Sequence, residues 1–478
     1  RAAGRRFADA PERALPDERK TAYRPALQLG DPGMCAYTDK VIKSLAPDNL
    51  KVMKEWNKEF TKPYTESELD SLRELSKYID KLWKEQVKAR RVLEENTVTT
   101  LEIFGHKDNR PEHSRSIREK DKFLFGTYKT EERKNAGAYA RLKFAMDYWC
   151  SLWFWPIDKA EELPTRWEFL QDMDYILHGV MPTEVEKDGQ LSLWDDDTPD
   201  EEGITLKNTE VDIPFLCKKF PRLAIARDIA DANKFMHWEL EFADVFADKG
   251  GFDLVIGNPP WVKLTWTEHN VLSDKNPMFA VKKLTATETA KRRSEALSDS
   301  ITNAIYFNEY ETLSGQKAFL NSTQNYDILK GQQSDLYRAF IPQSWQFLNV
   351  NGISSFVHPK GVFEDSNGGS LRREMNQRLR YVFKFINSEG LFTDVHRQTD
   401  FSLCIYGNLI DTSFDMICNL TNPNEIEELY EKPVETDRLI HINESILQLF
   451  SSIFDGSDIW QEARLPEIRY KKLVTVLQ

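Results

Sequence analysis

The residues that could do chemistry stand together in one segment, Gly250–Leu264, which reads GGFDLVIGNPPWVKL. An apolar run at its centre predicts a buried strand, and two consecutive prolines end that strand, because neither offers an N–H to a sheet. Asn258 then provides a side-chain carbonyl, and Pro259 a backbone carbonyl for which Pro260 supplies no competing amide. Two fixed acceptors with Trp261 beside them suit a planar ring that carries an amino group. In isolation, such a tetrapeptide would more simply be a stiff turn that caps a strand.

Short β-like runs are predicted to position this segment. They are 252–257 (FDLVIG), 352–358 (GISSFVH) and 401–406 (FSLCIY). Helical stretches separate such runs between Val211 and Gly407, which favours a parallel α/β sheet. Because the two prolines make the chain leave the sheet at its carboxyl edge, we expect the site at that edge, where open α/β folds place their ligands.

At this point the sequence resembles a known family. Asn-Pro-Pro-Trp after FDLVIG is similar to the catalytic motif of the S-adenosylmethionine-dependent amino-DNA methyltransferases, and most closely to N6-adenine enzymes of the gamma class. The flanking blocks occur in the same order as similar blocks in two groups of proteins: the methylase part of large type II restriction–modification proteins, and the adenine methylases of the BREX and DISARM phage-defence systems, which they resemble. These blocks are Phe235–Phe246, Gly331–Phe340, Asn351–Phe363 and Gly390–Gly407. The resemblance covers roughly residues 135–410.

The resemblance implies a fold, an activity and partners. The fold is α/β, a Rossmann-like class I methyltransferase sheet with an added helical region and a C-terminal extension. The activity is site-specific adenine-N6 methylation of double-stranded DNA, with S-adenosylmethionine as cofactor and the adenine flipped out of the duplex. Asn258 and the Pro259 carbonyl would hold the adenine amine, Pro260 would keep the turn rigid, and Trp261 would stack on the base. Other subunits of a restriction or antiviral defence system are implied as partners.

One expected part of that family is missing. These enzymes hold the cofactor with a glycine-rich turn after the first strand, and the nearest likeness here, Asp31-Pro32-Gly33, lacks further glycines and a preceding apolar strand. We therefore do not interpret it as the cofactor loop, and we expect the cofactor half of the sheet upstream of Arg1 or in another chain. Asp244 stands where the family often has an acidic residue near the cofactor's adenine; a plain surface carboxylate is an equal interpretation.

The rest of the chain suggests three regions. Residues 1–135 are expected to be a charged helical region, with an amphipathic helix between Glu66 and Asn96. Residues 136–410 hold the catalytic part, with an aromatic-rich helix at Ala138–Ile157, stopped by Pro156, and an acidic loop at 183–203. Residues 411–478 begin a C-terminal or target-recognition region, with helices suggested at 425–431 and 444–454.

Composition narrows the functional classes. The net charge of −13 argues against a general nucleic-acid coat, although a local basic cleft stays compatible with it. Five widely spaced cysteines exclude a disulfide scaffold or a zinc ribbon and suit a reducing cytoplasm, and no metal site is expected. No apolar stretch reaches the ~18 residues of a membrane helix, so no membrane partner is expected. The alternative function is a non-catalytic DNA-binding or assembly subunit that retains the methyltransferase fold.

Other polar residues are weaker candidates. His358 and His396 follow apolar runs and are best interpreted as structural histidines. Two basic groups could contact phosphate or could equally be solvated faces. They are Lys282, Lys283, Lys291, Arg292 and Arg293 after the catalytic strand, and Arg372, Arg373, Arg378 and Arg380, which we expect on one helix.

Overall fold

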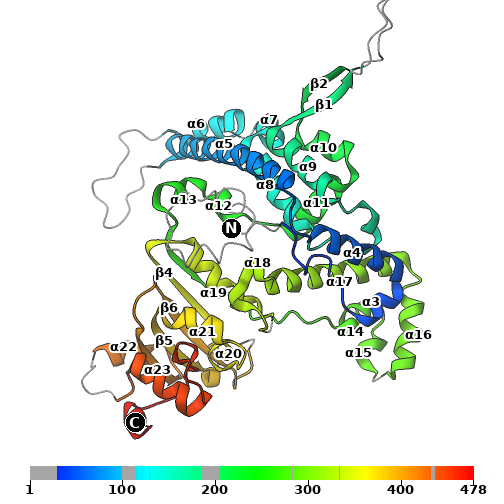
Figure 1. The fold of residues 1–478 in the computed structure, drawn as a ribbon. Helices are drawn as coiled ribbons and strands as arrows, with labels where there is room; N and C mark the ends of the chain where they lie inside the picture. Colours follow the sequence, from blue (N-terminus) through cyan, green and yellow to red (C-terminus); the bar gives the residue numbers. More distant parts are fainter. Residues whose placement is uncertain are drawn as a thin grey trace, which may run out of the picture. The chain divides into compact units, whose positions relative to one another are not determined.

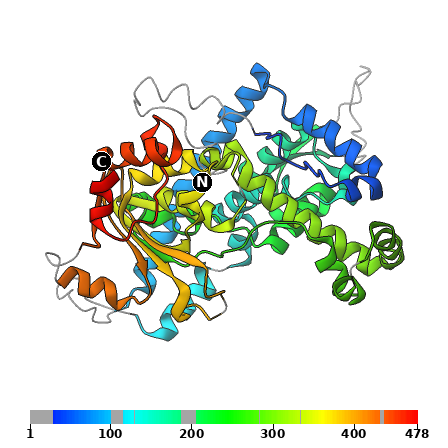
Figure 2. The same cartoon turned by 90° about the horizontal axis from the view of Figure 1, so that it is seen from below.

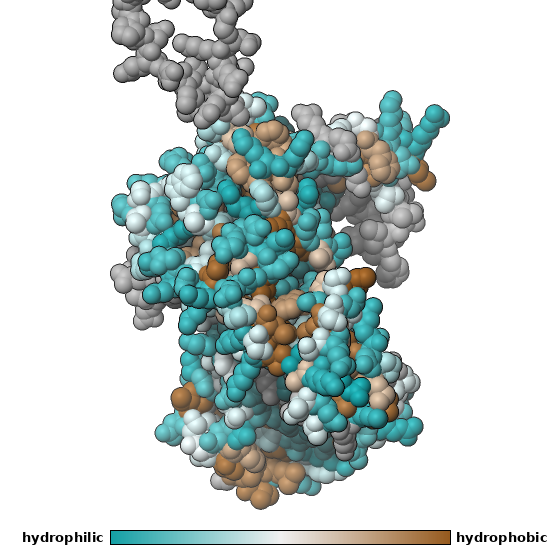
Figure 3. Space-filling model, turned by 90° about the vertical axis from the view of Figure 1, so that its right-hand side faces the viewer, coloured by the Kyte–Doolittle hydropathy of each residue, from teal (hydrophilic) through white to brown (hydrophobic). Residues whose placement is uncertain are grey.

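The computed structural model describes residues 29–99, 115–128, 130–185, 205–282, 284–332, 334–393, 395–431 and 437–477. Two compact units make up the chain, 1–244 and 245–478. Hydrophilic residues cover most of the face shown in Figure 3, in keeping with the 29% of charged residues in the sequence. Among the described residues, no helix combines the length and apolarity required to cross a membrane.

The first unit is helical, with one β-hairpin (Figure 1). Its elements are α3 (Lys40–Leu45), α4 (Pro47–Phe60), α5 (Glu66–Thr97), α6 (Ile117–Phe123), η2 (Leu124–Tyr128), α7 (Glu131–Ala136), α8 (Ala138–Ser151), η3 (Ile157–Glu162), α9 (Arg166–His178), β1 (Val180–Val185), β2 (Thr205–Glu210), α10 (Ile213–Lys219), α11 (Pro221–Asn233) and α12 (Trp238–Glu241). The boundary between the two units crosses α13 (Ala243–Lys249). Most of the predicted acidic loop, residues 186–203, lies outside the described residues.

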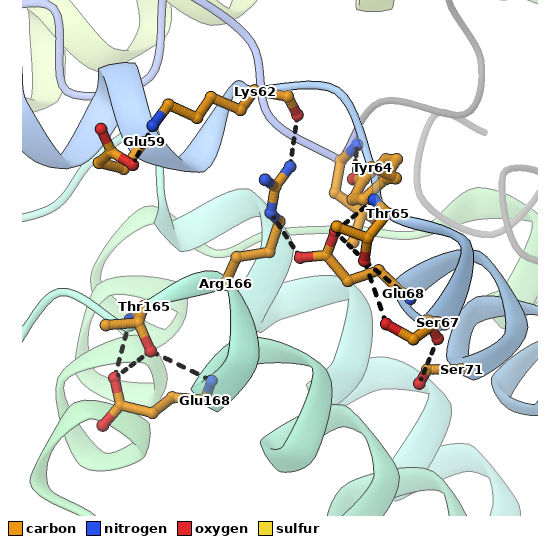
Figure 4. Close-up of polar contacts among 11 residues, drawn as sticks. Glu59, Lys62, Tyr64, Thr65, Ser67, Glu68, Ser71, Thr165, Arg166 and Glu168 are labelled. Atoms are coloured by element: carbon orange, nitrogen blue, oxygen red, sulfur yellow. Dashed lines mark hydrogen bonds and ion pairs between the residues drawn. The ribbon is translucent and has the colours of Figure 1, made fainter.

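Capping boxes explain where two of these helices begin (Figure 4). At α5, the Thr65 hydroxyl accepts from the Glu68 N–H, and the Glu68 carboxylate accepts from the Thr65 N–H at 2.7 Å. Thr165 and Glu168 repeat this arrangement at α9. Arg166 joins the two helix starts, because its Nε lies 2.9 Å from Oε1 of Glu68. The long charged helix predicted from Glu66 is therefore confirmed, and its start is fixed by local chemistry.

The aromatic run after Ala138 forms the core of this unit. Trp149, Trp153 and Trp155 are at most 1% exposed, which confirms the core interpretation of these rings. The helix itself was predicted too long: α8 ends at Ser151 instead of continuing to Pro156. Backbone turns replace it, with N–H groups at 153 and 154 donating to the carbonyls of 150 and 151. A continuous helix could not include Trp155, because the residue before a proline avoids helical geometry. With the turns in its place, the two later tryptophans lie in the core.

The second unit is built on a six-stranded mixed sheet of order β3-β4-β6-β5-β7-β8. The strands are β3 (Phe252–Gly257), β4 (Leu348–Pro359), β5 (Leu379–Ile386), β6 (Asp400–Tyr406), β7 (Ser413–Leu420) and β8 (Ile440–Asn443). The three predicted strands are present and the α/β fold class is confirmed. The expectation of a parallel sheet is wrong in part: β3–β4 and β5–β7 are parallel, whereas β4–β6, β5–β6 and β7–β8 are antiparallel.

Helices and loops cover both faces of this sheet (Figures 1 and 2). The helices of the second unit are α14 (Glu268–Ser273), α15 (Met278–Val281), α16 (Ala286–Ala296), α17 (Ser300–Asn321), α18 (Thr323–Tyr326), η4 (Asp327–Leu329), α19 (Leu336–Phe347), α20 (Gly361–Glu364), α21 (Gly369–Asn376), η5 (Asn387–Glu389), α22 (Asn424–Glu431), α23 (Glu444–Phe450), η7 (Ser451–Asp455), η8 (Trp460–Glu462) and α24 (Lys471–Leu477). One face packs against α19, α20, α21, α23 and α24. The other holds a smaller aromatic cluster that includes Trp261 and the α22 residue Ile426.

The C-terminal residues continue this sheet. The division between the compact units falls at 244/245, whereas the sequence predicts boundaries near 135 and 410. β7 and β8 extend the sheet beyond β5, and the buried Lys384 of β5 donates from Nζ to the Leu465 carbonyl at 2.6 Å. Residues after 410 thus complete the core of the second unit as well as extending it.

Candidate active site

The candidate site begins at strand β3, whose entry is set by glycine. Gly251 has φ +144°, and a Cβ there would lie 2.3 Å from the Phe347 carbonyl oxygen. Only glycine fits this approach of two backbones, which starts β3 beside β4. The parallel register then brings Gly257 opposite Phe356. The Asn-Pro-Pro-Trp turn therefore leaves the sheet at the carboxyl ends of β3 and β4, as the sequence predicts.

The two acceptors of the turn lack partners among the described residues and differ in exposure. Asn258 and Pro260 are exposed, whereas Pro259 is buried. Within the described part of the chain, neither the Asn258 amide nor the Pro259 carbonyl has a hydrogen-bond partner. Acceptors without an internal partner are free to accept hydrogen bonds from a ligand. The prolines fix the backbone of the turn, and with it the Pro259 carbonyl and the backbone from which the Asn258 side chain extends.

The exit from the turn is tied to the start of α19. Leu264 N–H donates to the Ser334 carbonyl at 3.0 Å, and Leu336 N–H donates to the Val262 carbonyl at 3.0 Å. Lys263 and Asp335 form the isolated antiparallel bridge between these bonds. Burial raises the pKa of the Asp335 carboxyl, and the nearby cations Arg338 and Lys263 oppose that rise. The block Gly331–Phe340, expected as a family landmark, thus holds the far end of the turn.

Trp261 lies in an aromatic environment and is half-buried. Its ring centroid is 5.4 Å from that of Phe392 at 61° between planes, and 6.0 Å from that of Phe401 at 35°. Its Nε1–H donates to the Val357 carbonyl at 3.3 Å. The ring is therefore partly a packing residue, and only its remaining surface can contact a base.

Sequence reasoning missed two residues beside Trp261. Phe392 belongs to the predicted landmark Gly390–Gly407 but received no role, and Asn387 lies just before it in η5. Asn387 is 0% exposed, and its side chain bonds only to the loop that carries Phe392. The available signal was an aromatic pair, Phe392 and Phe401, flanking a polar loop between two apolar runs.

The candidate cofactor residues lie in the first unit and already have partners. Asp244 is 8% exposed, and its Oδ1 lies 3.1 Å from Nε of Arg90 in α5. Asp31, in the segment that the sequence analysis rejects as a cofactor loop, accepts from the Gly33 N–H at 2.7 Å. The described residues therefore do not assemble a complete pocket for S-adenosylmethionine, and no group of three potential metal ligands occurs among them.

The histidines have structural surroundings. His358 is 0% exposed, stacks on Tyr337 at 5.6 Å, and its Nε2 lies 3.1 Å from the Tyr406 hydroxyl. Burial lowers the pKa of His358 to about 4, so the ring is neutral. His396 is exposed, and its Nδ1 accepts from the Gln398 N–H. The structural interpretation of His358 is confirmed.

The predicted arginine helix is wrong in its extent. α21 ends at Asn376, so Arg378 lies in a turn and Arg380 lies in β5. Arg372 donates to the carbonyls of Glu462 and Asp365, and Arg373 pairs with Glu462. These internal bonds leave little of the cluster for phosphate. In the other basic group, Arg293 pairs with Glu268, Lys291 is exposed and Arg292 is half-buried.

The comparison with known families gives a clear match. The family model described as Eco57I restriction-modification methylase matches residues 134–392, more than half of the chain. This range contains the Asn-Pro-Pro-Trp turn, the block Phe235–Phe246 before it, and Phe392, one of the two rings that contact Trp261. No curated protein matches the chain.

Two solved structures share similarity with it. The type I restriction-modification system methyltransferase subunit from Streptococcus thermophilus is 14% identical, with a TM-score of 0.26; the match covers 53% of this chain and 46% of that one. A modification subunit assigned to a type I restriction enzyme of Vibrio vulnificus YJ016 is 10% identical, with a TM-score of 0.24, over 84% of this chain and 93% of that one. The match thus spans about half the length of the Streptococcus protein.

Proposed function

Because the chain belongs to the Eco57I restriction-modification methylase family, we propose that it carries the catalytic part of a DNA adenine-N6 methyltransferase. The single observation that supports this most is the turn at the end of β3, where Asn258 and the Pro259 carbonyl are rigidly held acceptors without internal partners. The substrate in this proposal is an adenine flipped out of double-stranded DNA, at a cost of about a few kcal/mol.

The chain's own residues act on the acceptor base. The two N–H bonds of the adenine amine donate to Asn258 Oδ1 and the Pro259 carbonyl, which draws electron density onto the nitrogen and directs its lone pair away from the turn. Trp261 offers the unpacked part of its ring to the base, a contact worth about 1–3 kcal/mol. No strong base is required, because the amine loses its proton only as the new bond forms. Positioning and electrostatics carry the rate increase.

S-adenosylmethionine is the proposed methyl donor, and the chemistry that it supplies is an activated methyl group. The described residues do not fit it as a complete site, since Asp244 is paired with Arg90 and no glycine-rich turn follows a strand. Its binding residues are therefore not assigned here beyond Asp244, which stays a prediction. We also propose a cytoplasmic location, supported by five cysteines that are widely spaced in the sequence, and action within a restriction or antiviral defence system together with other subunits.

The incomplete cofactor site favours a second candidate, a non-catalytic DNA-binding or assembly subunit. The two are separated by incubating the full-length protein with DNA and S-adenosylmethionine carrying a labelled methyl group, and then identifying methylated nucleosides by mass spectrometry. The proposal predicts N6-methyladenine from the wild type and none from Asn258→Ala. Asn308→Ala on α17 is the matched control, because Asn308 is exposed and lies outside the turn. DNA binding without any methylated adenine would favour the second candidate.

A further inference from the structure

The loop between β5 and β6, residues 390–399, is organised by one buried side chain. Asn387 directly follows β5, as the first residue of η5, and is 0% exposed. Its Nδ2 donates to the carbonyls of Phe392 and Val395, each at 3.0 Å, and its Oδ1 accepts from the Phe392 N–H at 3.0 Å. An asparagine side chain offers two donors and an acceptor with two lone pairs, so this one is almost fully used by the loop.

Both backbone polar groups of Phe392 are bonded to that single amide. The position of Phe392 is therefore fixed relative to β5, although it lies in a loop, where backbone positions are usually less determined. Its ring contacts Phe401 at 5.0 Å and 85°, and it contacts Trp261 at 5.4 Å and 61°. A continuous chain of contacts thus runs from Asn387 through Phe392 to Trp261.

The two partners of Trp261 differ in how they are held. Phe401 belongs to β6 and stacks on Phe385 of β5 at 5.1 Å, so the sheet itself fixes it. Phe392 has no strand to hold it: its carbonyl accepts from the Val395 N–H at 3.3 Å, and its other backbone bonds among the described residues are to Asn387. Because edge contacts between rings are directional, a displaced Phe392 would let Trp261 change its tilt.

We propose that Asn387 is a positioning residue for methyl transfer. It holds Phe392 against Trp261, so that the free part of the Trp261 ring keeps one orientation relative to the acceptors of Asn258 and Pro259. Asn387 itself touches neither base nor cofactor. The inference rests on the proposed function, since it concerns the orientation of the ring that stacks on the base.

The variants separate positioning from simple stability. Asn387→Ala removes all three bonds, and Asn387→Asp keeps the acceptor for the Phe392 N–H while losing both donors. The matched control is Asn376→Ala. Asn376 is 2% exposed and its Nδ2 donates to the Gln461 carbonyl, as a buried asparagine on the face of the sheet opposite to the face that carries Trp261. All variants are compared at a temperature at which each is folded.

Two measurements test the proposal in the full-length protein. In single-turnover methyl transfer at saturating DNA and S-adenosylmethionine, Asn387→Ala should lower the rate about tenfold or more relative to Asn376→Ala, since small misplacements of reacting groups cost that much. Phe392→Leu should lower it similarly, and adding Asn387→Ala to Phe392→Leu should cause little further loss. Equal rates for Asn387→Ala and Asn376→Ala would overturn the proposal.

The second measurement is independent of activity. Tryptophan labelled with fluorine gives one ¹⁹F resonance for each ring, and Trp261→Phe identifies the Trp261 resonance. Asn387→Ala should shift or broaden it, Asn387→Asp should do so at least as strongly because a carboxylate oxygen would face the two carbonyls, and Asn376→Ala should leave it unchanged. An unchanged Trp261 resonance in Asn387→Ala overturns the positioning role. A wild type without methyl transfer would instead overturn the proposed function, while the resonance would still decide whether Asn387 positions Trp261.

Discussion

Replacing Trp261 by alanine should damage both stability and catalysis, and the structure sets the size of each effect. The ring makes two aromatic contacts, with Phe392 and Phe401, each worth about 0.5–1.5 kcal/mol beyond its area. Together they give about 1–3 kcal/mol, and the buried area of the half-exposed ring adds to this, so we expect Trp261→Ala to lower the free energy of unfolding by at least that amount. Phe401 is only 4% exposed, so Phe401→Ala should cost about 3–5 kcal/mol, as large core truncations do.

The effect of Trp261→Ala on catalysis should be separable from its effect on the free energy of unfolding. Loss of a stacking contact worth about 1–3 kcal/mol predicts a fall in kcat/KM of about 5- to 150-fold for Trp261→Ala, measured where the variant is fully folded. Trp261→Phe keeps a ring and should retain much of the activity. Urea unfolding gives the stabilities, and initial rates of methyl transfer give kcat/KM. If Trp261→Ala were as destabilised as Phe401→Ala and lost less than about fivefold in kcat/KM, Trp261 would be a core residue only.

The other predictions concern the turn, a buried histidine and the cofactor. Asn258→Ala should lower kcat by about 10²–10³-fold or more while folding and DNA binding stay near those of the wild type, because prolines hold the turn; near wild-type kcat would remove Asn258 from the mechanism. The pKa of His358 is about 4 in the folded state and ~6.5 in the unfolded state, so the unfolded state binds the proton first as the pH falls. The free energy of unfolding should therefore decrease below pH 6.5, by about 2 kcal/mol at pH 5. Urea unfolding at pH 8 and pH 5 should show a smaller difference between the two pH values for His358→Gln than for the wild type. Residues 1–478 alone should bind S-adenosylmethionine weakly or not at all in calorimetry, and micromolar binding would reveal a cofactor pocket of unfamiliar sequence.

The strands that the sequence predicts correctly share one property. The runs 252–257, 352–358 and 401–406 are short, apolar and bounded by glycine, proline or polar residues, so their extent follows from local chemistry. β5 was missed because Arg380, at its start, was assigned to one helix with Arg372, Arg373 and Arg378. Lys384 of β5 is 2% exposed, and its Nζ donates to the Leu465 carbonyl in the C-terminal segment. No local sequence pattern predicts such a tertiary contact.

The relative direction of neighbouring strands is the second feature of the fold that the sequence predicts poorly. An apolar run carries no sign of whether its neighbour is parallel, and only the connection does. Residues 387–399 join β5 to β6 without an α-helix among the described residues, which favours the antiparallel pairing observed. The direction of this pair could be predicted from its connection only once β5 itself had been identified. The error in β5 therefore produced the error in the sheet, and it also concealed Asn387 at the end of β5.

The edge position of β3 links the catalytic turn to the question of the cofactor. Among the described residues β3 pairs only with β4, and its Leu254 and Ile256 are 57% and 71% exposed. An edge strand with exposed apolar side chains is a ready surface for another strand, and soluble proteins usually cover or charge such an edge. The turn at the end of β3 needs no such neighbour to hold its acceptors, because two prolines and the bonds to residues 334–336 fix it. In the proposed function, recognition of the amine is therefore separable from binding of the methyl donor, so Asn258→Ala and cofactor binding test different parts of the proposal.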